Sequence, residues 1–243
     1  MLMCYTEIPM NKPQQYTVAI TKKIQLTPTV ILFTCTLTEP QKMQYTAGQY
    51  GAFIIDEKTR RQYSFCSAPG DPMTFEMVID TAPMGAGSRY FLSRNTGDVL
   101  TCMAPLGTFV FDTASHRKKI LVATGTGVAP LRSMTLDYLE HEGTDDLTLY
   151  WGMRHEEDLY WVGDFQELSL RYPNFRFVVT LSQPSDAWEG KKGRVTSHIV
   201  QDEHNLPGSD YYLCGNRNMI ADIKKQLADN RVPENQIHTE MYF

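Results

Sequence analysis

The chain has 243 residues, of which 42% are hydrophobic and 21% are charged, as in an ordinary globular protein of one or two domains. No apolar run approaches the roughly 18 to 20 residues of a membrane span, and residues 1–13 lack the basic-then-apolar layout of a signal peptide, so a cytoplasmic location is expected. The net charge of -5 argues against nucleic-acid binding, for which a basic stripe is typical.

The cysteines and histidines show no spacing that is typical of a metal site. The five cysteines are scattered singly, are odd in number and include no C-x-x-C pair. The six histidines lack the H-E-x-x-H pairing of many zinc enzymes. No metal is therefore expected, and free thiols are typical of proteins in a reducing compartment.

The first half of the chain, up to about residue 113, has the pattern of short β-strands. Polar and apolar residues alternate over 16–20 and 75–79, and β-branched or aromatic residues fill 30–37 and 49–55. Turn signals rich in glycine and proline, such as residues 68–72, separate these stretches. Many short strands of this kind indicate an antiparallel barrel or sandwich.

Two short motifs stand out in this half. The run Arg61-Gln62-Tyr63-Ser64 places a cation, an aromatic ring and a hydroxyl on one expected strand. Because alternate strand residues point the same way, Arg61 and Tyr63 are expected to share a face. The run Gly85-Ala86-Gly87-Ser88 precedes a short helix expected near residues 88–93, where glycines let backbone amides approach a phosphate. An ordinary helix cap explains this second run equally well.

After a polar linker, the pattern changes to strands that alternate with helices. Apolar strands are expected at 120–123, 147–151, 175–180 and 211–214, and residues 219–227 form one apolar helix face at i, i+4 and i+8. This alternation predicts a parallel sheet with helices on both sides. We therefore expect two domains with a boundary near residues 112–118.

The run Gly125-Thr126-Gly127-Val128-Ala129-Pro130 follows an expected strand and begins a helix, which is a phosphate-binding arrangement. Pro130 stands in place of the third glycine of the G-x-G-x-x-G fingerprint, and proline is tolerated in a first helical turn. This departure argues against an ordinary Rossmann dehydrogenase. No G-K-[ST] sequence follows, which excludes a P-loop ATPase.

Three further runs follow strand ends, where open α/β sheets bind their ligands. They are Trp151-Gly152-Met153-Arg154, Leu181-Ser182-Gln183-Pro184, and Cys214-Gly215-Asn216 with Met219. Together with the motifs above, these runs resemble the ferredoxin–NADP reductase family over about residues 15–243. The resemblance is closest to the NAD(P)H-dependent reductase components of oxygenase systems, without an iron–sulfur domain.

The resemblance implies an N-terminal antiparallel Greek-key β-barrel that binds FAD at residues 12–113. It also implies a C-terminal α/β domain with a parallel sheet that binds NAD(P) at residues 118–243. By this resemblance Arg61 contacts a phosphate, Tyr63 stacks on the flavin ring and Ser64 contacts flavin N5. FAD is favoured over FMN because the phosphate loop suits a dinucleotide. The implied flavin contacts are Arg61, Gln62, Tyr63, Ser64, Val78, Ile79, Asp80, Gly85, Gly87, Ser88, Tyr242 and Phe243.

The same resemblance places the Cys214 thiol and the Glu240 carboxyl near the nicotinamide, so Ser64, Cys214 and Glu240 are the expected catalytic residues. NADH is favoured over NADPH because Ser182 is followed by Gln183 where NADP-selective relatives tend to carry arginine. Arg154, Lys191, Lys192 and Arg194 are alternative partners for a 2′-phosphate. The implied nucleotide contacts are Thr126, Gly127, Val128, Pro130, Gly152, Arg154, Ser182, Cys214, Gly215, Asn216 and Met219.

The expected activity is hydride transfer from NAD(P)H to FAD, followed by single-electron transfer to a ferredoxin, a flavodoxin or an oxygenase component. One alternative is a reductase of ferric chelates or free flavin. Another is a non-catalytic subunit that binds flavin as a redox sensor.

Overall fold

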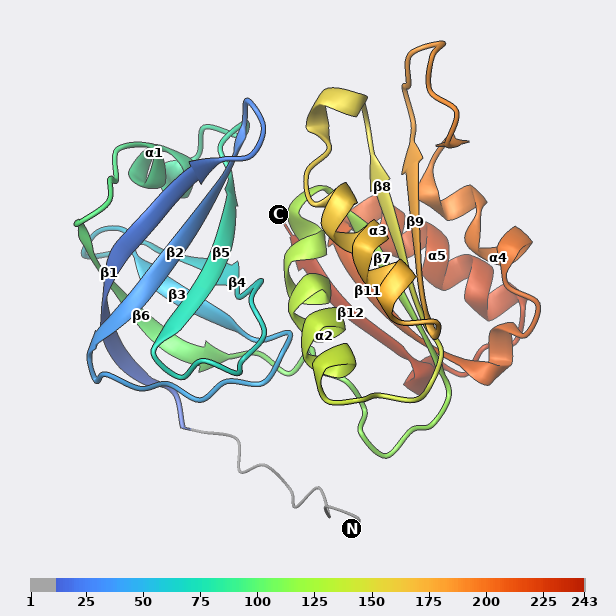
Figure 1. The fold of residues 1–243 in the computed structure, drawn as a ribbon, viewed down its shortest axis with the longest axis horizontal. Coiled ribbons are helices and arrows are strands. Elements are labelled where there is room, and N and C mark those ends of the chain that lie inside the picture. The colour runs from blue at the N-terminus through green and yellow to red at the C-terminus, as the bar shows by residue number, and fades with distance from the viewer. Residues whose placement is uncertain (1–11, 243) are drawn as a thin grey trace.

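The computed structural model describes residues 12–242, which form two sheets side by side with helices packed mainly around the second (Figure 1). The first half contains β1 (Gln14–Gln25), β2 (Val30–Glu39), β3 (Tyr50–Ile54), β4 (Arg60–Ser64), β5 (Thr74–Asp80), α1 (Ala86–Leu92) and β6 (Val99–Leu106). The second half contains β7 (Lys118–Thr124), α2 (Val128–Glu140), β8 (Leu147–Met153), α3 (Val162–Arg171), β9 (Phe175–Leu181), β10 (Lys191–Lys192), α4 (Ile199–Asp202), β11 (Ser209–Asn216), α5 (Arg217–Asp229) and β12 (Ile237–Tyr242).

The first sheet is antiparallel, with strand order β4-β3-β6-β1-β2-β5. It curls until its two edge strands approach each other, where Phe65 forms a single bridge with Met77. Five buried phenylalanines form its core, three from strands, one from the segment after β4 and one from α1. They are Phe33, Phe53, Phe65, Phe75 and Phe91. The expected barrel is thus a curled sheet in which one bridge joins the edges.

The second sheet is parallel throughout, with strand order β10-β9-β8-β7-β11-β12. Residues of β7 alternate between two apolar cores. Leu121 packs in the core that includes residues of α2, whereas Ile120 and Val122 pack in the core that includes residues of α5. Both faces of the sheet are therefore apolar, which explains why its strands are nearly continuous apolar runs. Strand order reverses between β7 and β11, and ligands of open α/β sheets bind at such a point.

The structure fixes the two halves against each other through the linker and through α2. The Asp112 amide donates a hydrogen bond to the Tyr212 hydroxyl at 2.9 Å, and Arg117 pairs with buried Asp210 at 3.2 Å. From α2, the buried Ser133 hydroxyl donates to the Ser67 carbonyl of the first half at 2.6 Å. These contacts hold the carboxyl ends of the β7 and β11 strands facing the first sheet.

The expected short helix at residues 88–93 is present as α1, which begins two residues earlier, at Ala86. Its start is marked by Gly85 in an extended conformation. Among residues 12–242, no helix is long and apolar enough to cross a membrane. Within the same residues, no group of three or more His, Cys, Asp or Glu side chains is arranged to hold a metal ion.

Candidate functional site

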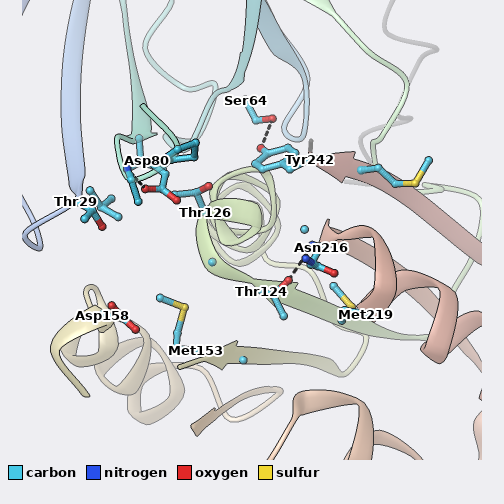
Figure 2. A pocket seen from close by; sticks show the side chains of 18 of the residues that line it. Thr29, Ser64, Asp80, Thr124, Thr126, Met153, Asp158, Asn216, Met219 and Tyr242 are labelled. Atoms are coloured by element: carbon cyan, nitrogen blue, oxygen red, sulfur yellow. Dashed lines mark hydrogen bonds between the residues drawn. The ribbon is translucent and has the colours of Figure 1, made fainter. Parts of the chain in front are cut away.

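A cleft of about 1470 Å³ lies between the two halves. This volume exceeds the roughly 300 to 1,000 Å³ of a pocket for one small ligand. Figure 2 shows Ser64 and Asp80 entering the cleft from the first half and Thr124, Thr126 and Asn216 entering from the second. The cleft therefore has room for two ligands that meet between the halves.

On the first-half side, Arg61 and Tyr63 converge on the start of α1. A Cβ atom added to Gly87 would lie 2.2 Å from the Tyr63 hydroxyl oxygen and 3.1 Å from Arg61 Cγ, so a side chain there would displace Tyr63. The two side chains thus share a strand face, as predicted, and they meet at the glycine loop. The Tyr63 ring is held edge-on by Phe91 at 4.9 Å between centroids. Arg61 forms no ion pair within residues 12–242, and its Nη1 donates to the Arg60 carbonyl at 2.8 Å.

Ser64 is the point where the two halves meet in the cleft. The Tyr242 hydroxyl donates to Ser64 Oγ at 2.6 Å, and the Ser64 hydroxyl donates to Glu240 Oε2 at 3.2 Å (Figure 2 shows the first of these bonds). Both partners come from β12, which pairs in parallel with β11 in the register Glu240 to Cys214. The carboxyl-terminal strand therefore links the second sheet to the R-x-Y-S strand of the first.

The Glu240 carboxyl resists ionisation. Burial raises its pKa to about 7, and the hydrogen bond from Ser64 only partly opposes this effect. The carboxyl is consequently divided between its neutral and charged forms near neutral pH, where it can hold or release a proton. A carboxyl of this kind beside a cleft is a frequent feature of functional sites.

On the second-half side, the glycine loop packs tightly against β11. A Cβ added to Gly127 would lie 2.4 Å from the Cys214 carbonyl oxygen, so a side chain there would force the two strand ends apart. The Asn216 amide donates to Thr124 Oγ1 at 2.9 Å, and the Trp151 indole donates to the Gly125 carbonyl at 3.0 Å. The loop is thus anchored on both sides, with Thr124 and Thr126 at the cleft wall.

The second-half side of the cleft is lined by two arginines, and a carboxylate lies just outside its wall. Arg154, Ser182 and Arg194 line it. Outside the wall, Glu156 accepts hydrogen bonds from the Ser185 amide at 2.8 Å and from the Ser185 hydroxyl at 2.6 Å. These bonds lower the pKa of Glu156, so it is ionised at neutral pH. A fixed negative charge therefore stands beside the loop that follows β9.

Most of the predicted site residues line this one cleft. They are Arg61, Gln62, Tyr63, Ser64, Val78, Asp80, Gly85, Gly87, Ser88, Thr126, Gly152, Arg154, Ser182, Gly215, Asn216, Met219, Glu240 and Tyr242. Phe243 lies outside the described residues. The roles of these side chains remain predictions, but their convergence from two sheets is a feature of the fold.

Five predicted residues are not among those that line the cleft: Ile79, Gly127, Val128, Pro130 and Cys214. All five are buried: Ile79 lies in β5, Gly127 in the glycine loop, Val128 and Pro130 in the first turn of α2, and Cys214 in β11. The Cys214 thiol, which was expected beside the nicotinamide, is wholly enclosed, and burial raises its pKa well above the usual value. It is accordingly a neutral thiol in the second sheet.

Sequence reasoning missed several cleft residues that belong to no motif. Thr27 and Thr29 come from the β1–β2 turn, Tyr50 from β3, and Tyr160 from the segment before α3. The β1–β2 turn has a Thr-Pro-Thr signal, but nothing in it points toward the cleft. Only the fold brings these residues together.

Each half of the chain matches a known domain family. Residues 17–111 match the oxidoreductase FAD-binding domain, and residues 121–225 match the oxidoreductase NAD-binding domain. The chain is therefore an oxidoreductase with one domain for each cofactor.

Individual relatives narrow this class. Ferredoxin–NADP reductase B of Sorangium cellulosum (strain So ce56) is 30% identical over 209 residues, which cover 82% of this chain and 85% of that protein. The phenol hydroxylase P5 protein of Acinetobacter pittii (strain PHEA-2) is 30% identical. The matched region covers 94% of this chain and 66% of that protein. The Amycolatopsis cytochrome P450 reductase GcoB superposes with a TM-score of 0.87 at 26% identity, over 94% of this chain and 70% of that one.

The chain belongs to the ferredoxin–NADP reductase family. Its residues fit the FAD and nicotinamide nucleotide that the two domains bind. On one side, a Cβ at Gly87 would fill the space beside Arg61 and Tyr63. On the other, Gly125 and Thr126 line the cleft directly before α2, where the backbone amides of a helix start can bind a phosphate.

Proposed function

We propose that this oxidoreductase takes electrons from NADH and passes them singly to a protein acceptor of the ferredoxin, flavodoxin or oxygenase-component type. One observation carries the proposal. Ser64 of the R-x-Y-S strand lies within hydrogen-bond distance of both Glu240 and Tyr242 of the nucleotide half. A protein that only stored a flavin would have no need to bring these two sites together.

Bound FAD supplies the conversion between two-electron and one-electron transfer. The chain's own contribution is to position and to exclude water, since hydride transfer depends on close approach and alignment. In this proposal Arg61 and the start of α1 hold the phosphates, and Tyr63 provides a stacking surface. Ser64 offers its hydroxyl at the reacting face. Glu240 accepts the Ser64 hydrogen bond when ionised and holds a proton when neutral.

The preference for NADH rests on the loop after β9. Gln183 is uncharged there, and the ionised Glu156 is bonded to Ser185 two residues further on. A 2′-phosphate at this loop would meet a negative charge at short range, which costs binding free energy. Arg154 and Arg194 also line this end, and in this proposal they contact the phosphates that NADH itself carries.

The acceptor is proposed from the relatives. Their printed names describe a ferredoxin–NADP reductase and a phenol hydroxylase protein, and the chain spans 66% of the second. We propose the same kind of acceptor here, and we propose 12–113 and 118–243 as the bounds of the two domains.

The acceptor assignment is tested by steady-state NADH oxidation with matched concentrations of a ferredoxin, a flavodoxin, ferric citrate and free FMN. The proposal expects a kcat/KM for at least one protein acceptor that is well above those for both small molecules. Higher efficiency with ferric citrate or free FMN would replace it with a small-molecule reductase.

A further inference from the structure

Tyr160 carries a buried hydroxyl that has no hydrogen-bond partner. Its side chain is 6% exposed, and it lines the cleft. Three other side chains in residues 12–242 have a buried polar atom without a partner, and none of these lines the cleft: Arg94, Thr135 and Asp202. Burying a hydroxyl without a partner costs about 1 to 3 kcal/mol in general, so such groups in native proteins usually have one.

The ring of Tyr160 is fixed next to the glycine loop. It packs edge-on against Trp151, with 4.9 Å between centroids, and edge-on against Trp161 at the same distance. The Trp151 indole in turn donates to the Gly125 carbonyl at 3.0 Å. Because these contacts leave the ring little freedom, the hydroxyl has a defined position, and Trp151 links the ring to the Gly125–Gly127 turn.

Two groups of the first half act on the Tyr160 hydroxyl. Burial raises the Tyr160 pKa well above its usual value, and the Cys66 thiol and then the Asp80 carboxylate at the end of β5 add to this effect. Tyr160 also packs in the core cluster that contains Val30 and Val78 of the first half. The hydroxyl therefore remains protonated and can act as a donor.

We propose that the Tyr160 hydroxyl donates a hydrogen bond to a phosphate or ribose oxygen of the nicotinamide nucleotide bound at the Gly125–Gly127 turn. This inference rests on the proposed function, since it needs the nucleotide to bind in the cleft. Three observations carry it: the missing partner, the position after β8 at the ligand-binding edge of the sheet, and the rigid link through Trp151. The bound nucleotide completes the hydrogen bonding of this side chain.

The test compares Tyr160→Phe with the wild type, both loaded with FAD, by calorimetric titration with NAD⁺ as the probe. The variant keeps the ring and loses only the hydroxyl. It is expected to bind NAD⁺ about five- to tenfold more weakly, as for one lost hydrogen bond. Its FAD affinity is expected to be unchanged, and its Tm without NAD⁺ is expected to be equal or higher, because an unpaired buried hydroxyl is removed.

Tyr211→Phe is the matched control. Tyr211 is fully buried in β11 of the second sheet, but its hydroxyl donates to the Leu206 carbonyl at 3.0 Å, and it does not line the cleft. This variant should have a lower Tm and wild-type NAD⁺ affinity. Unchanged NAD⁺ affinity in Tyr160→Phe, or a loss of FAD affinity in its place, would overturn the inference while the proposed function stands. A wild type that binds no NAD⁺ would overturn both.

Discussion

At the scale of single residues, the hydrogen-bond chain from Tyr242 through Ser64 to Glu240 has a defined direction. Tyr242 donates to Ser64, and Ser64 donates to Glu240, so the acceptor at the end is a partly buried carboxyl. An ionised Glu240 holds the serine proton toward itself, whereas a neutral Glu240 holds it more weakly. The state of one carboxyl thus governs the Ser64 hydroxyl that the family motif assigns to the flavin.

Glu240 makes the stability of the fold depend on pH. Its pKa is about 7 in the folded chain, against 4.5 for an unperturbed glutamate, so the folded state binds the proton more tightly. The resulting stability is complete below pH 4.5 and is lost as pH rises through about 7. Glu240→Gln should therefore be more stable than the wild type at pH 8, relative to pH 5, by up to about 3 kcal/mol.

Urea unfolding at the two pH values measures this difference. Glu234→Gln is the control, since Glu234 is exposed at the other end of the β12 region and its replacement should leave the pH dependence unchanged. Equal pH dependence in the wild type and Glu240→Gln would show that the carboxyl ionises as it does in water.

Nucleotide choice also belongs to the residue scale. The double variant Gln183→Arg with Glu156→Gln adds a cation and removes the fixed anion beside the loop after β9. Because a guanidinium pairs well with a phosphate, the ratio of kcat/KM for NADPH to that for NADH should rise about tenfold or more. Steady-state rates with both nucleotides measure the ratio, and no change would place the 2′-position away from this loop.

At the scale of elements, α2 connects the glycine loop to the first half of the molecule. It begins directly after the glycine loop, and one turn later it contacts the first half. Arg132 Nη1 donates to the Cys66 carbonyl at 2.7 Å and pairs with Glu76 at 3.3 Å, while its guanidinium lies 4.4 Å from the Trp161 ring centroid. The helix that carries the nucleotide loop is therefore bonded to the segment that follows Ser64. We expect it to set the distance between the two cofactors.

Arg132→Met tests this coupling. A small displacement of one half should slow alignment-dependent transfer by about tenfold or more, while contacts to the nucleotide remain. The expected result is a lower rate of flavin reduction at saturating NADH with an unchanged Kd for NAD⁺, measured by stopped-flow absorbance and calorimetry. Lys225→Met, which breaks an exposed pair within α5, should change neither. A rate equal to that of the wild type would leave Arg132 with a structural role only.

Strands and helices were predicted correctly from the sequence where a single periodicity of apolar residues dominates a segment. The strands from Tyr16 to Ile20 and from Phe75 to Ile79 alternate, and the apolar runs before the glycine loops are buried on both faces, so local pattern was enough. It did not predict which residues of the glycine loop line the cleft. Val128 and Pro130 stand in the loop motif, yet the first turn of α2 directs them into the core.

At the scale of the whole molecule, the site exists only because distant segments meet. Ser64 and Glu240 are 176 positions apart, and no local pattern states that they are hydrogen-bonded. The two sheets and the loops at their facing ends followed from periodicity and from the family motifs. The burial of Cys214 and the places of Tyr50 and Tyr160 depended on how the halves pack, which the sequence alone does not express.

The central claim is that the two sites work together in one cleft. Its most direct test is an anaerobic absorbance titration of the FAD-loaded protein with NADH, and separately with NADPH, at the flavin band near roughly 450 nm. We expect complete bleaching by one equivalent of NADH per flavin, at a higher rate than with NADPH. A protein that retains FAD but is bleached by neither nucleotide would contradict it and would indicate a flavin-binding protein without reductase activity.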